Sequence, residues 1–297
     1  MRVLTHTVTA AEANRTVKQL LHGLWGVSGT FLSRLKFRQA ITVNGAPVTV
    51  RFVPCPGDVL AADISDLPGE HPHIRPVDFP LDILYEDEDL LLINKPAGIA
   101  VHPAALTEET ATIAGAAAHY LHSESFHAVN RLDRGTTGVM AVAKTGFIHA
   151  RCMAMLHTDD FRREYRAVCE GIPSPAEGDI DLPIGRAESS LLKRQADPLG
   201  GQPAHTHYEV LAASQGRALL RLTPTTGRTH QLRVHMAAIG HPLTGDWLYG
   251  TEDRALIARP ALHSYHLRMT HPLTGTTIDV TAPLPEDMQR LLKEERL

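Results

Sequence analysis

The sequence predicts an α+β fold in which a mixed, mostly antiparallel sheet follows a small N-terminal α/β domain. From Val77 onward, β-branched runs succeed one another and helical stretches are inserted irregularly. That order favours an antiparallel sheet over repeated βαβ units. Before Val77, two short helical patterns lead into a hairpin signal and then into a proline-rich segment. We therefore expect a small domain at residues 1–66, a linker at residues 67–76 and a large domain at residues 77–297.

The first predicted elements are two short helices and a hairpin. Apolar residues recur at helical spacing between residues 15 and 41, and the pattern is interrupted from Gly26 to Gly29. Two β-branched runs then flank Asn44-Gly45, the strongest short hairpin signal that a sequence offers. The run VLAADI predicts a strand after the hairpin, and LPGEHPHIRP, which has no periodicity, predicts the linker.

The large domain is predicted to alternate irregularly between strands and helices. The predicted strands are the runs LLLIN, VMAVA, REYRAVC, HYEVL, ALLRL and TIDVTA. The predicted helices are residues 113–122, 148–156, 231–238 and the amphipathic stretch 285–295.

Composition and cysteine usage indicate the class of protein. With 43% hydrophobic and 21% charged residues, the chain has the balance of a folded globular protein. Cys55, Cys152 and Cys169 form neither a CxxC pair nor an even framework, which favours a reducing cytoplasm over secretion. The N-terminal residues lack the apolar core of a signal peptide, and no run of about 18 apolar residues predicts a membrane span. We expect a cytoplasmic monomer.

A basic segment stands out against the net charge of −4. Between Asn14 and Gly57 there is no Asp or Glu. The segment carries six cationic side chains: Arg15, Lys18, Arg34, Lys36, Arg38 and Arg51. A local basic surface can neutralise phosphates even on an acidic protein, so this segment predicts nucleic-acid binding. The alternative is a solvated face on which the charges cluster by chance.

The nine residues NRLDRGTTG place Asp133 between two arginines and beside two glycines. The flanking runs FHAVN and VMAVAK predict a strand on each side, with Asp133 at the turn. A carboxylate between cations favours its ionised form and can act as a nucleophile or a base. The alternative is a carboxylate that only caps the amides of its own loop.

This loop resembles the central motif of the RluA-type pseudouridine synthases, HRLDxxTSG. The positions that agree are Arg131, Leu132, Asp133, Thr136 and Gly138. Asn130 stands where His is usual, and Thr137 where Ser is usual. Thr keeps the hydroxyl of Ser, whereas Asn loses a titratable ring.

Further segments resemble the same family in the same order, from about residue 80 to residue 285. INKPAGIAVHP resembles its first motif, and DDFRREYRAVCEG resembles KxYxAxxxG, with Tyr165 at the tyrosine and Arg163 in the usual Lys place. TGRTHQLRVHMAAIGHPLTGDWLYG resembles its GRTHQIRxH block, in which Arg233 matches the arginine that pairs with the catalytic Asp. Residues 14–64 resemble the small RNA-binding domain of ribosomal protein S-four.

The resemblance implies a pseudouridine synthase fold and an isomerase that converts uridine to pseudouridine in RNA. The glycosidic bond between the ribose and a ring nitrogen of uracil is broken, and the base is turned and rejoined through ring carbon five, so no redox cofactor and no metal is needed. Asp133 is the implied catalytic carboxylate, acting on ribose or uracil or taking a sugar proton. Arg233 would keep Asp133 ionised and aimed.

Two further side chains acquire roles from the resemblance. Tyr165 could stack on the freed uracil and shuttle a proton, although an isolated strand tyrosine is usually a core residue. The target base must leave its stack, and Arg131 could fill the vacated space or grip a phosphate. We expect Arg131 to face away from Asp133 if the loop is extended; the alternative is a surface arginine with a carboxylate partner.

Large-subunit ribosomal RNA is the expected substrate, because synthases with such an N-terminal domain commonly act there. A synthase acting on tRNA is an alternative. A catalytically inactive RNA-binding or ribosome-assembly factor is another, but it predicts erosion of Asp133, Tyr165 or Arg233, and all three are present. A glycosidase would need a second acid near Asp133, and no motif singles out Asp159 or Asp160.

Overall fold

The computed structural model describes all residues except 68–73, 104–110, 124, 188–189 and 191, so most of the predicted linker lies outside the described residues. At the N-terminus it confirms the two short helices, α1 (Val17–Trp25) and α2 (Gly29–Phe37). Gly26 ends α1 at a φ of 61°, a left-handed conformation that glycine adopts without steric cost. Thr16 and Gln19 form a capping box at the start of α1.

The N-terminal strands form a four-stranded sheet in the order β1-β4-β2-β3. The predicted hairpin is confirmed as β2 (Ile41–Val43) and β3 (Ala46–Pro47), and the run VLAADI forms β4 (Val59–Asp63). Strand β1 (Val3–Thr7) was not predicted; it pairs antiparallel with β4, more than 50 residues along the chain.

The large domain is built on a ten-stranded sheet whose central path runs β10-β13-β14-β9-β15-β8-β6-β5, with β16 paired to β15 and β7 to β8. Its strands are β5 (Ile83–Glu86), β6 (Leu90–Lys95), β7 (His127–Ala128), β8 (Thr137–Ala143), β9 (Phe161–Glu170), β10 (Glu177–Asp181), β13 (His205–Ser214), β14 (Arg217–Pro224), β15 (Leu262–Thr270) and β16 (Thr277–Thr281). All pairs of these strands are antiparallel except β15 with β8. The structure therefore confirms a mixed, mostly antiparallel sheet.

Both faces of the central strands are buried, which explains their nearly continuous apolar sequences. On β6, Leu90 and Leu92 enter one hydrophobic core while Leu91 and Ile93 enter another, as the two-residue period of a strand requires. Helix α4 (Gly146–Met155) contributes to the first core; α3 (Ile113–Tyr120) and α5 (Gln231–Ala238) contribute to the second. Helix α6 (Glu286–Glu295) packs on a third, smaller cluster. All four predicted helices are thus confirmed within three residues of their expected bounds.

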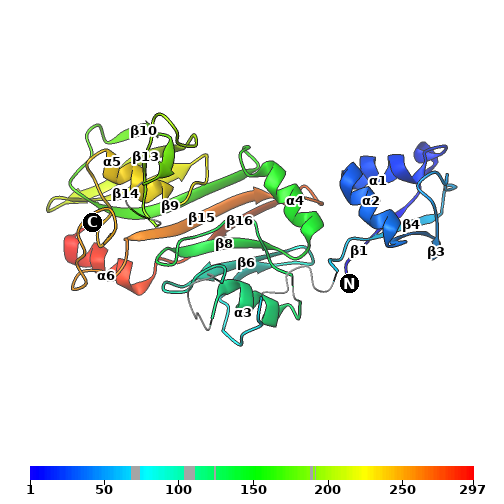
Figure 1. The fold of residues 1–297 in the computed structure, drawn as a ribbon, viewed down its shortest axis with the longest axis horizontal. Helices are drawn as coiled ribbons and strands as arrows, with labels where there is room; N and C mark the ends of the chain where they lie inside the picture. Colours follow the sequence, from blue (N-terminus) through cyan, green and yellow to red (C-terminus); the bar gives the residue numbers. More distant parts are fainter. Residues whose placement is uncertain (68–73, 104–110, 124, 188–189, 191) are drawn as a thin grey trace.

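The N-terminal domain packs directly against the large domain at α4, and Figure 1 shows it (blue) at one end of the molecule, beyond that helix. The rings of Phe31 and Phe147 lie 4.8 Å apart, and Arg151 Nη1 donates to the Trp25 carbonyl at 2.5 Å. A bidentate ion pair joins Arg2 to the buried Asp89. A shared apolar core spans the contact, so the two domains are docked as well as linked.

No helix in the described part of the chain is long and apolar enough to cross a membrane. The three cysteines are free; Cys152 and Cys169 are buried, and Cys55 is exposed.

Candidate active site

Asp133 lies in the loop between β7 and β8, which are paired antiparallel, so the predicted strand-turn-strand is confirmed. The Thr136 amide donates to the Asp133 carbonyl at 3.0 Å and closes the turn. Gly138 follows with a φ of +105°, and a Cβ there would lie 2.1 Å from the Ser264 carbonyl oxygen. Only glycine allows β8 to approach β15 so closely, which fixes the C-terminal end of the loop.

Lys95, at the end of β6, holds this loop in place through hydrogen bonds. Its Nζ donates to the carbonyls of Pro96, Arg134 and Thr136 at 2.9, 3.2 and 3.0 Å. The side chain is fully buried, and burial lowers its pKa to about 8. The Lys95 ammonium group therefore orders the loop that carries Asp133.

Arg233, on α5, faces Asp133 as the motif implied. Its Nη1 lies 3.5 Å from Asp133 Oδ2. The guanidinium is held by Asp246, which accepts bonds from its Nε and Nη2, both at 2.7 Å. Asp246 is completely buried and also accepts from the amides of Leu248 and Tyr249. A buried bidentate pair therefore fixes the cation that faces the candidate catalytic carboxylate.

His230 brings a second ring to the same oxygen: its Nε2 lies 4.0 Å from Asp133 Oδ2. Its Nδ1 is 2.9 Å from the Tyr249 hydroxyl, and Arg233 lies over the Tyr249 ring, 5.0 Å from the centroid. Burial lowers the pKa of His230, which favours the neutral imidazole at neutral pH. The residue has a φ of 59°, a strained conformation of the kind that clusters at functional sites.

Tyr165 projects from β9 into the same region. It is 6% exposed, and burial raises the pKa of its phenol, so the hydroxyl keeps its proton at neutral pH. Arg163, two residues earlier on β9, is also buried and donates to the Thr226 carbonyl at 3.1 Å. Arg163 thus supports the loop after β14, whereas Tyr165 presents a ring to the cavity.

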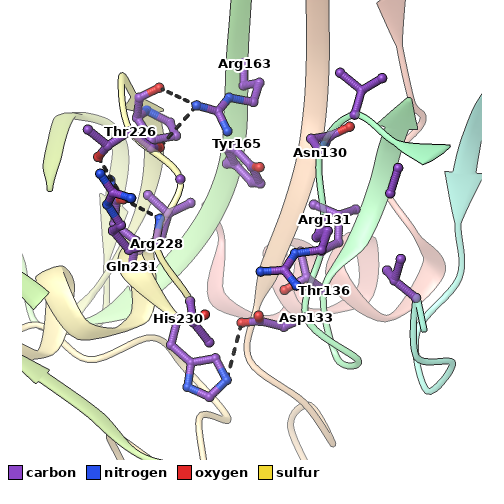
Figure 2. Close-up of a pocket in the computed structure, with 18 of the residues that line it drawn as sticks. Asn130, Arg131, Asp133, Thr136, Arg163, Tyr165, Thr226, Arg228, His230 and Gln231 are labelled. Atoms are coloured by element: carbon purple, nitrogen blue, oxygen red, sulfur yellow. Dashed lines mark hydrogen bonds and ion pairs between the residues drawn. The ribbon is translucent and has the colours of Figure 1, made fainter. Parts of the chain in front are cut away.

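These groups converge on a cavity of about 800 Å³ lined by Asp133, Tyr165, Arg233, His230 and Arg131, among others. Figure 2 shows Arg131 and Asp133 entering it from one side and His230 from the other, below Tyr165. The structure therefore brings together the three predicted catalytic residues, from segments up to 100 positions apart in the chain. Asp133 remains accessible, with 27% of its side chain exposed.

The expected orientation of Arg131 is wrong. Arg131 and Asp133 both line the cavity and enter it from the same side (Figure 2). Arg131 is exposed, and no described carboxylate lies within ion-pair distance of it. The reading of Arg131 as half of a surface ion pair therefore finds no support among the described residues.

Asn130, the departure from the motif beside Asp133, is buried. Its Oδ1 accepts a hydrogen bond from the Ala141 amide on β8 at 2.8 Å. Its Nδ2 has no hydrogen-bond partner among the described residues. The side chain therefore anchors the start of the loop to the sheet.

The predicted basic residues of the N-terminal domain differ in their availability. Arg15, Lys18 and Lys36 are exposed, and Arg34 lies 5.8 Å from the centroid of the Phe31 ring. Arg38 is engaged within its domain: it donates to the Ser65 carbonyl at 2.6 Å and lies 3.5 Å from Asp63. The exposed lysines are therefore better placed than Arg38 to meet a phosphate.

The other histidines of the GRTHQ block serve the fold. His235 Nδ1 and Nε2 contact the Thr206 hydroxyl and the Leu182 carbonyl, both at 2.9 Å, and His241 Nδ1 contacts the Glu170 carbonyl at 3.0 Å. No three His, Cys, Asp or Glu side chains among the described residues are arranged to hold a metal ion.

Sequence reasoning gave no individual role to Asp246 or Tyr249, although both lie in the GDWLYG end of the Arg233 block. The sequence shows only that an acid and a tyrosine lie inside that block. The structure shows their roles, because the turn after α5 brings Asp246 to Arg233 and Tyr249 to His230.

Comparisons with known proteins find similarity to RNA pseudouridine synthases. Residues 89–238 match the family model described as RNA pseudouridylate synthase. An RNA pseudouridine synthase of Bacillus subtilis (strain 168), YjbO, whose description calls it uncharacterised, is 41% identical over 94% of this chain and 99% of its own length. Ribosomal large subunit pseudouridine synthase D of Escherichia coli (strain K12) is 40% identical over 76% of this chain and 74% of its own.

A solved structure, human RNA pseudouridylate synthase domain containing 4, matches 72% of this chain and 93% of its own with a TM-score of 0.59 and 26% identity. The family model covers half of this chain, and the B. subtilis relative is similar over nearly its whole length. The motifs around Asp133, Tyr165 and Arg233 thus stand in the family's order within the family's fold. The chain belongs to the RNA pseudouridylate synthase family, of the RluA type, and is an isomerase that forms pseudouridine in RNA.

Proposed function

We propose that the protein isomerises uridine in large-subunit ribosomal RNA, with Asp133 as its catalytic carboxylate. The observation that carries the assignment of Asp133 is its place in the cavity: a partly exposed carboxylate facing a buried, fixed guanidinium and a tyrosine ring. The ribosomal substrate is supported by the E. coli relative, whose name assigns it to the large ribosomal subunit. We also propose that the protein works as a cytoplasmic monomer.

In the proposed reaction, Asp133 acts on the nucleoside through Oδ1. Arg233 and His230 both approach Oδ2, so Oδ1 is the oxygen left to face the substrate. Asp246 prevents the guanidinium of Arg233 from turning away from Asp133. When the bond between the sugar and the ring nitrogen breaks, the uracil has to turn before it rejoins through carbon five. The face of Tyr165 would hold the ring during that turn. Carbon five gives up its proton once it has bonded to the sugar, the former glycosidic nitrogen takes up a proton, and the Tyr165 hydroxyl is placed to relay this transfer.

The base reaches this cavity only after it leaves its stack, a step that costs a few kcal/mol. Arg131 projects into the cavity beside Asp133 without a described carboxylate partner. We propose that its guanidinium occupies the space that the base vacates or grips the flanking phosphate.

The test of the proposed function is modification of ribosomal RNA from a strain that lacks the gene. We expect the purified protein to form pseudouridine at a defined position of the large-subunit RNA, mapped by chemical labelling and primer extension. Large-subunit RNA isolated from the same strain carrying the gene shows which position is authentic. Modification of tRNA in place of ribosomal RNA would contradict the substrate assignment, and no product with either RNA would contradict the activity.

We further propose that the N-terminal domain binds RNA through Lys18 and Lys36, which are exposed, with Phe37, 92% exposed, as a stacking surface. Replacing both lysines by Glu should weaken RNA binding and flatten its dependence on salt, because phosphate contacts release counterions. Glu substitutions at Lys293 and Arg290 on α6 change the net charge equally and serve as the control. If Lys18→Glu with Lys36→Glu leaves the salt dependence of RNA binding unchanged, these lysines belong to a solvated face that does not bind RNA.

A further inference from the structure

A second cavity, of about 490 Å³, adjoins the catalytic one. The two share Arg131 and residues 227–229 in their linings. The outer wall of the second cavity is the small hairpin of β11 (Ile184–Arg186) and β12 (Arg194–Ala196), which stands apart from the main sheet. A strand that extends out of the catalytic cavity past Arg131 therefore reaches this hairpin.

Among the residues that the structure describes, the second cavity is lined by no acidic side chain and by four arginines: Arg131, Arg186, Arg194 and Arg228. In the described part of the chain, none of these guanidiniums has a carboxylate within 4.0 Å, and Arg228 Nε donates to the Pro203 carbonyl. Other arginines of the large domain, such as Arg217, Arg221 and Arg259, are paired with acids. The cationic lining is therefore a local exception within an acidic protein.

The hairpin places two of these charges directly opposite each other. In the antiparallel register of β11 and β12, Arg186 is the partner of Arg194. Directly opposed residues have Cβ atoms about 4.5–5.5 Å apart on one face, and like charges there are destabilising. An anion between the two guanidiniums would remove that repulsion and accept hydrogen bonds from both.

The hairpin is tied to the catalytic groups. The Arg194 amide donates to the Tyr249 hydroxyl at 2.9 Å, and that hydroxyl also contacts His230. Ile184 is buried and exchanges two backbone hydrogen bonds with Gln202. The arginine pair is thus held at a defined place relative to Asp133, as a site that positions a bound strand requires.

We infer that Arg186 and Arg194 bind a backbone phosphate of the RNA strand next to the target uridine, and so set which nucleotide reaches Asp133. The inference rests on RNA being the substrate. A polynucleotide fits better than a free anion, because the arginines extend in a continuous path from Arg131 at the catalytic cavity to the hairpin. Phosphate contacts fix the register of a bound strand without reading its sequence.

The test uses the full-length protein and a fragment of large-subunit ribosomal RNA. We expect Arg186→Ala with Arg194→Ala to raise Kd at least about tenfold and to reduce the slope of log Kd against log salt by about one to two. At saturating RNA the double variant should form pseudouridine at neighbouring uridines as well as at the target position, because the register of the strand is no longer fixed. Arg254→Ala with Arg290→Ala removes the same charge from exposed positions outside both cavities and is the control.

A second experiment identifies the phosphate that Arg186 and Arg194 bind. Each phosphate around the target uridine is replaced in turn by a neutral methylphosphonate linkage. One linkage should weaken binding to the wild type but not to the double variant, and Arg186→Lys with Arg194→Lys should restore most of the salt slope. Each single Ala variant should melt no lower than wild type, because a repulsion is removed.

Unchanged Kd and salt slope, or an equal loss in the control, would overturn the inference. Strong competition by inorganic phosphate without any effect of the linkages would assign the hairpin to a free anion instead. If no RNA is modified but binding responds as expected, the proposed function fails while the phosphate site stands.

Discussion

Asp133→Asn is expected to abolish pseudouridine formation, lowering the single-turnover rate by at least about 10³-fold. The substitution keeps the shape of the side chain and the turn made by the Asp133 carbonyl, but removes the charge that faces Arg233. RNA binding should persist within a few fold, because the phosphate-binding cations are untouched. Pseudouridine is counted on the ribosomal RNA fragment, and affinity is measured on the same fragment.

The matched control is Asp159→Asn, the same chemical change at an exposed carboxylate paired with Arg162. It should retain wild-type turnover. If Asp133→Asn keeps a rate within tenfold of wild type, Asp133 loses its assigned role, and the loop-capping alternative becomes the better account of this residue.

Asp246→Ala is expected to impair both stability and catalysis. Removing one partner of a buried ion pair typically costs about 3–5 kcal/mol, because the other charge is left uncompensated. The loss also orphans the amides of Leu248 and Tyr249, so the free energy of unfolding in urea should fall by an amount in this range. At saturating RNA the turnover rate should fall as well, because Arg233 is no longer held toward Asp133.

Asp89→Ala is the control that separates the loss of stability from the loss of catalysis. Asp89 is also buried and forms a bidentate pair with Arg2 at the domain contact, but it lines neither cavity. It should destabilise the protein without slowing turnover, when both variants are assayed where they are fully folded. Wild-type turnover in Asp246→Ala would show that Arg233 keeps its position without its carboxylate partner.

The docking of the N-terminal domain bears on how RNA is held. Its helices share a core with α4, and Arg151 joins α4 to the end of α1. The exposed Lys18 and Lys36 therefore stand in a set position relative to the large domain. RNA bound at both places would be held at two points, which favours a structured substrate over a short single strand.

The predicted elements show where sequence patterns carry information. The helices 17–25 and 29–37, the Asn44-Gly45 hairpin and the helix 231–238 were predicted because periodicity, caps and turn residues are local. Strand β1 and the hairpin β11-β12 were not, because short strands are defined by partners and not by their own periodicity.

The sequence by itself determined the chemical groups of this protein. Asp133, Tyr165 and Arg233 stand in ordered motifs, and those motifs identify the family because each spans only a few neighbouring residues. Only the tertiary structure decided how the groups are held. Asp246 fixes Arg233, and Lys95 supports the Asp133 loop from the core. The opposed Arg186 and Arg194 adjoin the catalytic cavity. Each of these arrangements depends on which distant segments the sheet and its helices bring together, and on how deeply the fold buries a charged side chain. Local spacing in the sequence encodes neither the pairing of segments nor the burial.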